Sequence, residues 1–175
     1  EEGIEHQCVM PEVPGPEGLL NMTEIGKQAL AGMPEKLSRF MQWQRPIELR
    51  PVNQADPLHP EPVPPFRDIW IRAVAPLPDD PVMHKVLLAY SSDYSLLGTA
   101  LLPHALTFTQ GNIRAASLDH AMWFHSPPDL NAWHFVEQRP LVARGGRGTA
   151  FAQVWRADGT LVATFTQEAL MRPVD

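Results

Sequence analysis

The chain has 175 residues, of which 44% are hydrophobic and 19% are charged, and its formal net charge is −6. These values are typical of one globular domain with extensions, or at most two small domains, and not of a disordered chain. The acidic balance argues against nucleic-acid binding through a basic face, and no apolar run is long enough to span a membrane. The single cysteine, Cys8, excludes an intrachain disulfide and fits a reducing compartment such as the cytoplasm.

The N-terminal third is rich in proline and predicts little regular structure. Residues 1–20 are interpreted as a linker or the tail of an upstream unit, and residues 21–45 as a linker holding two short helical turns. A first strand is predicted at residues 46–52. Five prolines between residues 57 and 65 then predict a stiff extended loop that cannot join a central sheet.

The most convincing helix is predicted at residues 85–97. Asp80 and Pro81 upstream provide an N-cap carboxylate and a first-turn proline, and Gly98 is a plausible stop. A helical period of about 100° per residue places a set of apolar residues on one face, with Asp93 in its middle. A carboxylate on a core-facing stripe must be paired or used, because burying it unpaired costs several kcal/mol. With a slightly different helical phase, Asp93 would instead lie at the boundary. The apolar residues of this face are Val86, Ala89, Tyr90 and Leu97.

The remaining sequence predicts strands. Asp158-Gly159 is the strongest hairpin signal, and Gly145-Gly146 marks the preceding turn. The order of strand, strand, helix and four antiparallel strands predicts an α+β fold, with one long helix against one face of a curved sheet. The predicted strands besides the first are residues 66–75, 113–124, 132–143, 148–156 and 160–172.

Strand alternation identifies polar residues on faces that could pack inward. Gln167 is the one polar residue on the face that also carries Ala163 and Phe165, and Ser117 shares a face with Ala115 and Trp123. Each alone has an ordinary explanation, a small residue in a tight sheet for the serine and a satisfied amide for the glutamine. Together with Asp93, three polar residues from three elements suggest a shared pocket. A carboxylate, a hydroxyl and an amide can hold and activate a water molecule.

Other candidates are weaker. Asp119 and His120 are neighbours on the predicted strand and would point to opposite faces, so they cannot act together directly. Arg144 and Arg147 flank the glycine pair and could contact a phosphate, although a solvated hairpin tip is the simpler interpretation. Because no ligand spacing for zinc and no nucleotide-binding fingerprint occurs, no metal and no cofactor are expected.

Several motifs resemble those of the acyl-CoA thioesterase II family. They are Tyr90-Ser-Ser-Asp93, the block Ser-Leu-Asp-His-Ala-Met-Trp-Phe-His at residues 117–125, and Gln-Glu-Ala-Leu-Met-Arg at residues 167–172. The resemblance runs from about residue 46 to the end, so residues 46–175 are expected to form one hotdog domain, a curved antiparallel sheet wrapped around one long central helix. It implies hydrolysis of fatty acyl-CoA to a free acid and CoA. It also implies catalytic roles for Asp93, Ser117 and Gln167.

The resemblance also implies a partner. Family chains usually carry two hotdog repeats, and this sequence has room for the second alone, with residues 1–7 resembling the end of the first. We expect a homodimer or pairing with a separate first repeat, an acyl-CoA substrate, and neither nucleic acid nor membrane as a partner. Two alternatives remain open: a noncatalytic half that completes a partner's site, and an enoyl-CoA hydratase, which would need a histidine and a carboxylate facing one cavity.

Overall fold

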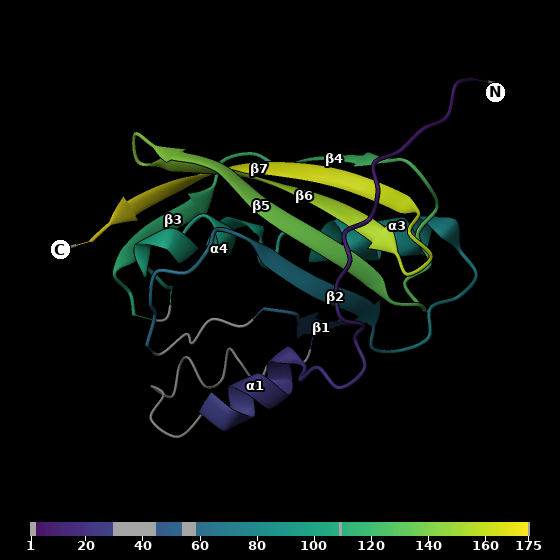
Figure 1. Cartoon of the computed structure of the whole chain (residues 1–175), viewed down its shortest axis with the longest axis horizontal. Coiled ribbons are helices and arrows are strands. Elements are labelled where there is room, and N and C mark those ends of the chain that lie inside the picture. The colour runs from purple at the N-terminus through teal and green to yellow at the C-terminus, as the bar shows by residue number, and fades with distance from the viewer. Residues whose placement is uncertain (1–2, 30–44, 54–58, 109, 175) are drawn as a thin grey trace.

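The structure is a computed structural model, and it describes residues 3–29, 45–53, 59–108 and 110–174 (Figure 1). The helices are α1 (Met22–Ala29), α3 (Pro81–Ser91), α4 (Leu96–Thr99) and the 3-10 turn η1 (Leu102–His104). The strands are β1 (Ile47–Pro51), β2 (Arg67–Ala73), β3 (Ile113–Ser117), β4 (Ala121–Phe124), β5 (His134–Arg144), β6 (Arg147–Arg156) and β7 (Leu161–Pro173).

These strands form one seven-stranded antiparallel sheet in the order β1-β2-β5-β6-β7-β3, with β4 also paired to β7. Figure 1 shows the sheet curving over α3 and α4. The predicted α+β hotdog architecture is therefore confirmed, with strand limits that differ from the prediction by a few residues at most outside residues 113–124. Of the two helical turns predicted between residues 23 and 42, α1 contains the first, and residues 30–44 lie outside the described ranges.

Both glycine-containing hairpin turns form where the sequence places them. Gly145 and Gly146 connect β5 to β6 with φ values of 61° and 72°, which a two-residue hairpin turn requires and which side chains with a Cβ resist. Between β6 and β7, Asp158 accepts a hydrogen bond from the backbone N–H of Thr160 at 2.9 Å, and Gly159 has a φ of 86°. Local turn chemistry thus sets the register of the three longest strands.

Helix α3 starts as predicted but faces the other way. Asp80 accepts a hydrogen bond from the backbone N–H of Val82 at 2.9 Å, and Pro81 occupies the first turn. The predicted core face is wrong: Val86 and Tyr90 are 57% and 51% exposed, whereas Leu88 is fully buried. The inward face carries His84, Leu88 and Ser91. Polar residues on the buried face mislead a period count, because the count assumes that polar side chains face water.

The helix is also shorter than predicted. It ends at Ser91, a turn follows over residues 92–95, and the chain then forms α4, so Gly98 lies within a second helix and does not terminate the first. Asp93 consequently lies in the turn and is exposed. The glycine has a packing role, since a Cβ at this position would come within 3.3 Å of the Arg67 guanidinium.

The strand predicted at residues 113–124 is interrupted by a β-bulge. Ser117 pairs with Ala169 and Ala121 with Thr166, so one extra residue is inserted opposite β7. The backbone N–H groups of residues 118 and 119 both donate to the carbonyl of Glu168. The predicted common face of Ser117 and Trp123 is therefore wrong, because an extra residue reverses the alternation beyond it.

The main core fills the inner face of the sheet beneath the helices. It includes Leu88 of α3 and Leu96 of α4, and Met122 of β4 packs against its edge. Its strand residues are Ile47, Leu49, Ile69, Ile71, Ala73, Val136, Ala150, Ala152, Val154, Val162, Ala163 and Phe165.

A smaller aromatic cluster covers the outer face of the sheet. Trp70, Phe135 and Trp155 are buried there, and the segment before α1 packs on them through Met10, Val13 and Leu19. The Trp70 indole N–H donates to the carbonyl of Pro14 at 2.8 Å. Figure 1 shows this N-terminal segment running across the strands.

Leu88→Ala tests the observed phase of α3. Because Leu88 is fully buried, we expect the free energy of unfolding to fall by about 2–5 kcal/mol. Val82→Ala is the control on the same helix, since Val82 is 65% exposed, and it should change the value by no more than about 0.5 kcal/mol. Chemical denaturation measures both, and equal losses would contradict the assigned phase.

Candidate active site

The three residues predicted to share a pocket meet at the side-chain amide of Gln167. Its nitrogen donates to a carboxylate oxygen of Asp93 at 2.5 Å and to the hydroxyl oxygen of Ser117 at 2.9 Å. The three residues come from β7, from the turn after α3 and from the end of β3. Gln167 is 74 and 50 residues away from these partners in the chain, so the cluster forms only in the folded protein.

The chemistry of the cluster fixes the orientation of the amide. A carboxylate only accepts hydrogen bonds, so the NH₂ group and not the carbonyl oxygen of Gln167 must face Asp93. Both amide hydrogens are then used, one on each partner. The opposite atom, Oε1, is buried and makes no hydrogen bond to any residue that the structure describes. The amide therefore acts as a clamp on the carboxylate and the hydroxyl.

Gln167 differs from its partners in burial. It is 2% exposed on the inner face of β7, as alternation predicted, whereas Asp93 and Ser117 are both exposed. Ser117 pairs with the buried Ala169 and so lies on the inner side as predicted, but at an exposed position, whereas Asp93 lies outside the helix whose stripe it was predicted to interrupt. The Asp93 carboxylate and the Ser117 hydroxyl are open to solvent, and the buried amide of Gln167 holds both by hydrogen bonds. Such an arrangement suits chemistry on a bound molecule, because substrate and water can reach the two exposed groups.

The turn that carries Asp93 has two further anchors, which sequence reasoning missed. The Ser92 hydroxyl lies 2.8 Å from the His120 Nε2 atom, and the Ser95 hydroxyl donates to the Gln138 side chain at 3.0 Å. The ring of His120 also stacks on Phe165, with 5.6 Å between ring centroids. The sequence signal for these contacts was the concentration of polar side chains at residues 92–95, where Ser92 and Ser95 lie close to Asp93.

The β-bulge directs neighbouring side chains to different partners. Asp119 accepts a hydrogen bond from the backbone N–H of Glu168 at 2.7 Å, while His120 contacts Ser92. No hydrogen bond or ion pair joins Asp119 to His120 in the described part of the chain. The pair therefore does not form the acid–base dyad that a hydratase would need.

The space next to the cluster is small. A cavity of about 10 Å³ between α3 and the sheet is lined by serines of the turn, Gln138 and Phe165. This volume suits about one water molecule and no acyl chain. A larger hollow of about 440 Å³ lies on the outer face, between the N-terminal segment and Trp70 and Trp133, away from Asp93. An acyl group at Asp93 would therefore lie on the exposed surface of this chain.

The aromatic neighbour of the site stays neutral. Burial, and then the contact with Tyr90, raise the pKa of Tyr94, so its phenol is protonated at physiological pH. Tyr90 and Tyr94 pack edge to face, with 5.3 Å between ring centroids. Tyr94 thus adds no charge next to Asp93.

Comparisons with known proteins identify the family. The family model for acyl-CoA thioesterases matches residues 37–170, most of the chain. The chain belongs to the acyl-CoA thioesterase family. It is 37% identical to acyl-CoA thioesterase 2 of Haemophilus influenzae over 98% of its own length and 60% of that protein. It is also 37% identical to human acyl-coenzyme A thioesterase 8, over 97% of its length and 54% of that protein.

Solved structures agree with this assignment. An acyl-CoA thioesterase II, TesB2, from Mycobacterium marinum superposes with a TM-score of 0.73 at 31% identity, over all of this chain and 60% of the other. A hot dog fold protein from Alicyclobacillus acidocaldarius has a TM-score of 0.69 at 20% identity and supports the fold alone. This thioesterase-family chain thus spans little more than half the length of the proteins it matches. No helix in the described ranges is both long and apolar enough for a membrane span.

His134 predicts a pH dependence of stability. Burial lowers the pKa of this fully buried side chain, whose Nδ1 atom lies 3.1 Å from the carbonyl of Ala132. The unfolded chain therefore binds a proton below pH about 6.5 that the folded chain excludes. The neutral His134 side chain contributes fully to stability above pH about 6.5, and this contribution is lost as the pH falls toward the lowered pKa of the folded state.

We expect the free energy of unfolding to decrease between pH 7.5 and 5, and this decrease to be shallower in His134→Leu. Binding of one extra proton by the unfolded chain changes the free energy of unfolding by at most about 1.4 kcal/mol per pH unit. Urea denaturation across this range measures the slope. His125→Gln, at an exposed histidine, should keep the slope of the parent chain. An unchanged slope in His134→Leu would contradict the assignment.

Proposed function

We propose that this chain hydrolyses fatty acyl-CoA thioesters to a free fatty acid and CoA, with Asp93, Ser117 and Gln167 as its catalytic residues. The observation that carries the proposal is the Gln167 amide, which bonds to both the Asp93 carboxylate and the Ser117 hydroxyl. The family supports thioester chemistry. The cluster provides a base without a covalent nucleophile, as water attack requires.

In the proposed mechanism, Asp93 takes a proton from a water molecule as the oxygen attacks the thioester carbonyl. The Ser117 hydroxyl, held by the same amide, hydrogen-bonds the water or the developing oxyanion. The tetrahedral intermediate then collapses: its C–S bond breaks and CoA leaves as a thiolate, which takes up the proton that Asp93 removed from the water. Thiols have pKa values near 8.5, so the leaving group needs little help from an acid. Gln167 maintains the separation of base and hydroxyl and does not itself exchange protons.

The test is release of CoA thiol from medium- and long-chain acyl-CoA by the purified 175-residue chain. Asp93→Asn keeps the size of the side chain and removes the base, so kcat should fall by about 10²–10⁴-fold while thermal unfolding is retained. Asp119→Asn is the matched control, because its side-chain oxygen can still accept the Glu168 N–H, and it should keep its activity.

Unchanged turnover in Asp93→Asn would contradict the assigned base. A folded parent chain that releases no thiol would instead favour the noncatalytic half, which contributes surface to a partner's site. Enoyl-CoA hydration, measured in parallel, would need a different pair of residues, since Asp119 and His120 contact separate partners.

We also propose that the chain pairs with a second hotdog repeat, either another copy or a separate first repeat. In this proposal residues 46–175 are the repeat, and residues 1–20 and 21–45 are the tail and linker between repeats. The supporting observation is an exposed apolar surface on α3 and β4, joined by Lys85, whose ammonium lies 5.7 Å from the Phe124 ring centroid. Its exposed apolar members are Met83, Val86 and Tyr90 of α3 and Phe124 of β4, whose partner Ala163 lies on the inner face of the sheet. Large exposed apolar side chains grouped in this way often mark an interface.

The pairing surface adjoins the site, because Asp93 follows α3 and Ser117 precedes β4. A second repeat there would supply the walls that the 10 Å³ cavity does not provide for an acyl chain. We propose the cytoplasm as the location of such an enzyme, in line with the reducing environment suggested by the single cysteine.

Sedimentation analysis tests the pairing. The parent chain should be a dimer, and Val86→Glu with Phe124→Glu should dissociate it, because charges would be buried without partners. Val74→Glu is the control at a residue that is 63% exposed outside this surface, and it should remain dimeric. A monomeric parent with full activity would exclude the need for a second repeat.

A further inference from the structure

Four arginines gather at one end of the sheet. The strand register places Arg114 of β3 directly opposite Arg172 of β7, and Arg144 of β5 directly opposite Arg147 of β6. The two pairs are neighbours: the backbone N–H of Met171 donates to the carbonyl of Gly146 at 2.8 Å. We call these residues the arginine cluster. Figure 1 shows the β5–β6 turn, the start of β3 and the end of β7 together at this end of the molecule.

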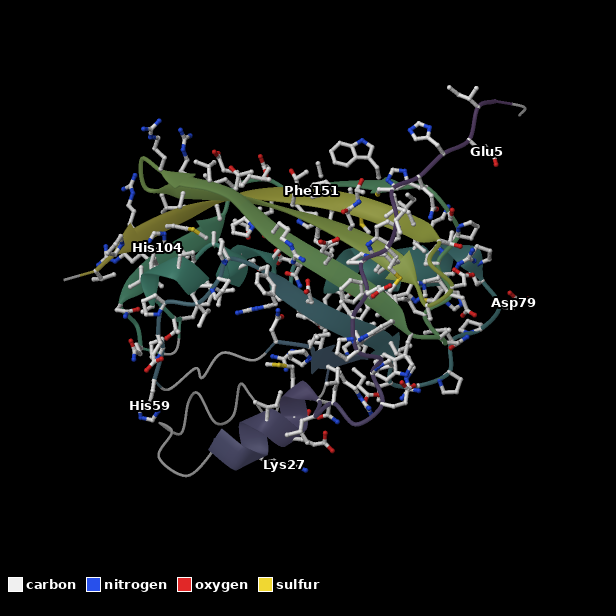
Figure 2. The ribbon with its side chains drawn as sticks, viewed as in Figure 1. Glu5, Lys27, His59, Asp79, His104 and Phe151 are labelled. Carbon is white, nitrogen blue, oxygen red and sulfur yellow. The ribbon has the colours of Figure 1, made fainter. Side chains whose placement is uncertain are left out.

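All four arginines lie on the outer face. Arg147 pairs with Leu170, which shares its face of β7 with Arg172, while Met171 between them is buried on the inner side. Phe151 of β6, labelled in Figure 2, lies on the same outer face as Arg147. Figure 2 also labels Asp79, close to the start of α3, at the opposite end of the sheet. The cluster is thus separate from the apolar pairing surface of α3 and β4.

Folding does not explain this arrangement. Like charges directly opposite each other on adjacent strands destabilise a sheet. One carboxylate is near, at 3.7 Å between the Arg147 Nε atom and Glu168, and within the described ranges Arg114, Arg144 and Arg172 form no ion pair. The chain as a whole carries −6. A local excess of positive charge in an acidic protein indicates a ligand that carries several negative charges.

We propose that the arginine cluster binds the phosphate groups of the CoA nucleotide while the thioester lies at Asp93. The proposal rests on the function proposed above. Guanidinium groups match phosphate oxygens in two-point hydrogen bonds, and the cluster offers four of them next to the backbone of Gly145-Gly146. CoA carries a diphosphate and a 3′-phosphate, so its nucleotide end suits a multivalent cationic surface.

The position of the cluster fits an extended CoA. Arg114 precedes Ser117 by three residues on β3, a separation of roughly 10 Å along an extended strand. β3 lies at the edge of the sheet, where the pantetheine arm can pass from the inner face to the outer face. The arm connects a reacting thioester at Ser117 and Asp93 to phosphates at Arg172 and its neighbours.

The experiment compares the full chain with Arg147→Ala/Arg172→Ala. Binding of adenosine 3′,5′-bisphosphate, measured by calorimetry or NMR titration, requires no turnover and should weaken at least about tenfold. Turnover is measured with an acyl-CoA and with the matching acyl-N-acetylcysteamine thioester, which has no phosphates. The kcat/KM for acyl-CoA divided by the kcat/KM for the N-acetylcysteamine thioester should fall about tenfold in the variant, chiefly because the KM for acyl-CoA rises.

Arg156→Ala, at the other end of β6, is the matched control and should change neither the bisphosphate affinity nor the ratio. Arg147→Lys/Arg172→Lys keeps the charge and should recover part of both. No bisphosphate binding by the parent chain, or equal binding by parent and alanine variant, would overturn the proposal. If the parent chain binds the bisphosphate and the alanine variant does not, the result supports phosphate binding by the arginine cluster, even without turnover. If the parent chain hydrolyses neither substrate, the result refutes the hydrolytic function separately.

Discussion

The buried amide of Gln167 holds this site together. Two hydrogens on one nitrogen connect a carboxylate and a hydroxyl that belong to different elements and are both exposed to solvent. The amide lies on β7, which pairs with three other strands, so its position is determined by the most extensively bonded strand of the sheet. The buried Gln167 amide can therefore fix the positions of the exposed Asp93 and Ser117 side chains, although both residues lie where regular secondary structure ends.

Those irregular points are a helix break and a β-bulge. Ending α3 at Ser91 exposes Asp93 while the neighbouring serines reach His120 and Gln138 on the sheet. The extra residue between β3 and β4 turns His120 toward the turn and leaves Ser117 beside the amide. A regular helix and a regular strand would have directed these side chains elsewhere. The local loss of regular hydrogen bonding is offset by the long-range side-chain contacts.

The surroundings of the site follow from its location near the surface. The cavity beneath the turn accommodates about one water, so in the proposed function surfaces outside this cavity enclose the acyl chain. The apolar surface includes residues of β4 and the arginine cluster includes Arg114 of β3, and the two differ in chemistry. We propose that the first contacts another repeat and that the second binds phosphates. In these proposals, the exposed Asp93 and Ser117 lie between a surface for a second repeat and a surface for phosphates.

The sequence by itself determined β1, β2, β5, β6 and β7, both glycine hairpins, the N-terminus of α3 and the inward position of Gln167. These features depend on turn chemistry, capping and two-residue alternation, which operate within a few neighbouring residues. It also identified Asp93, but through a helical phase that is wrong, and Ser117, through an alternation that holds along β3 and reverses beyond the bulge. Only the tertiary structure decided where α3 ends and where the bulge lies. Both are stabilised by contacts across 28 and 49 residues, Ser92 with His120 and Asp119 with Glu168, which no local pattern contains.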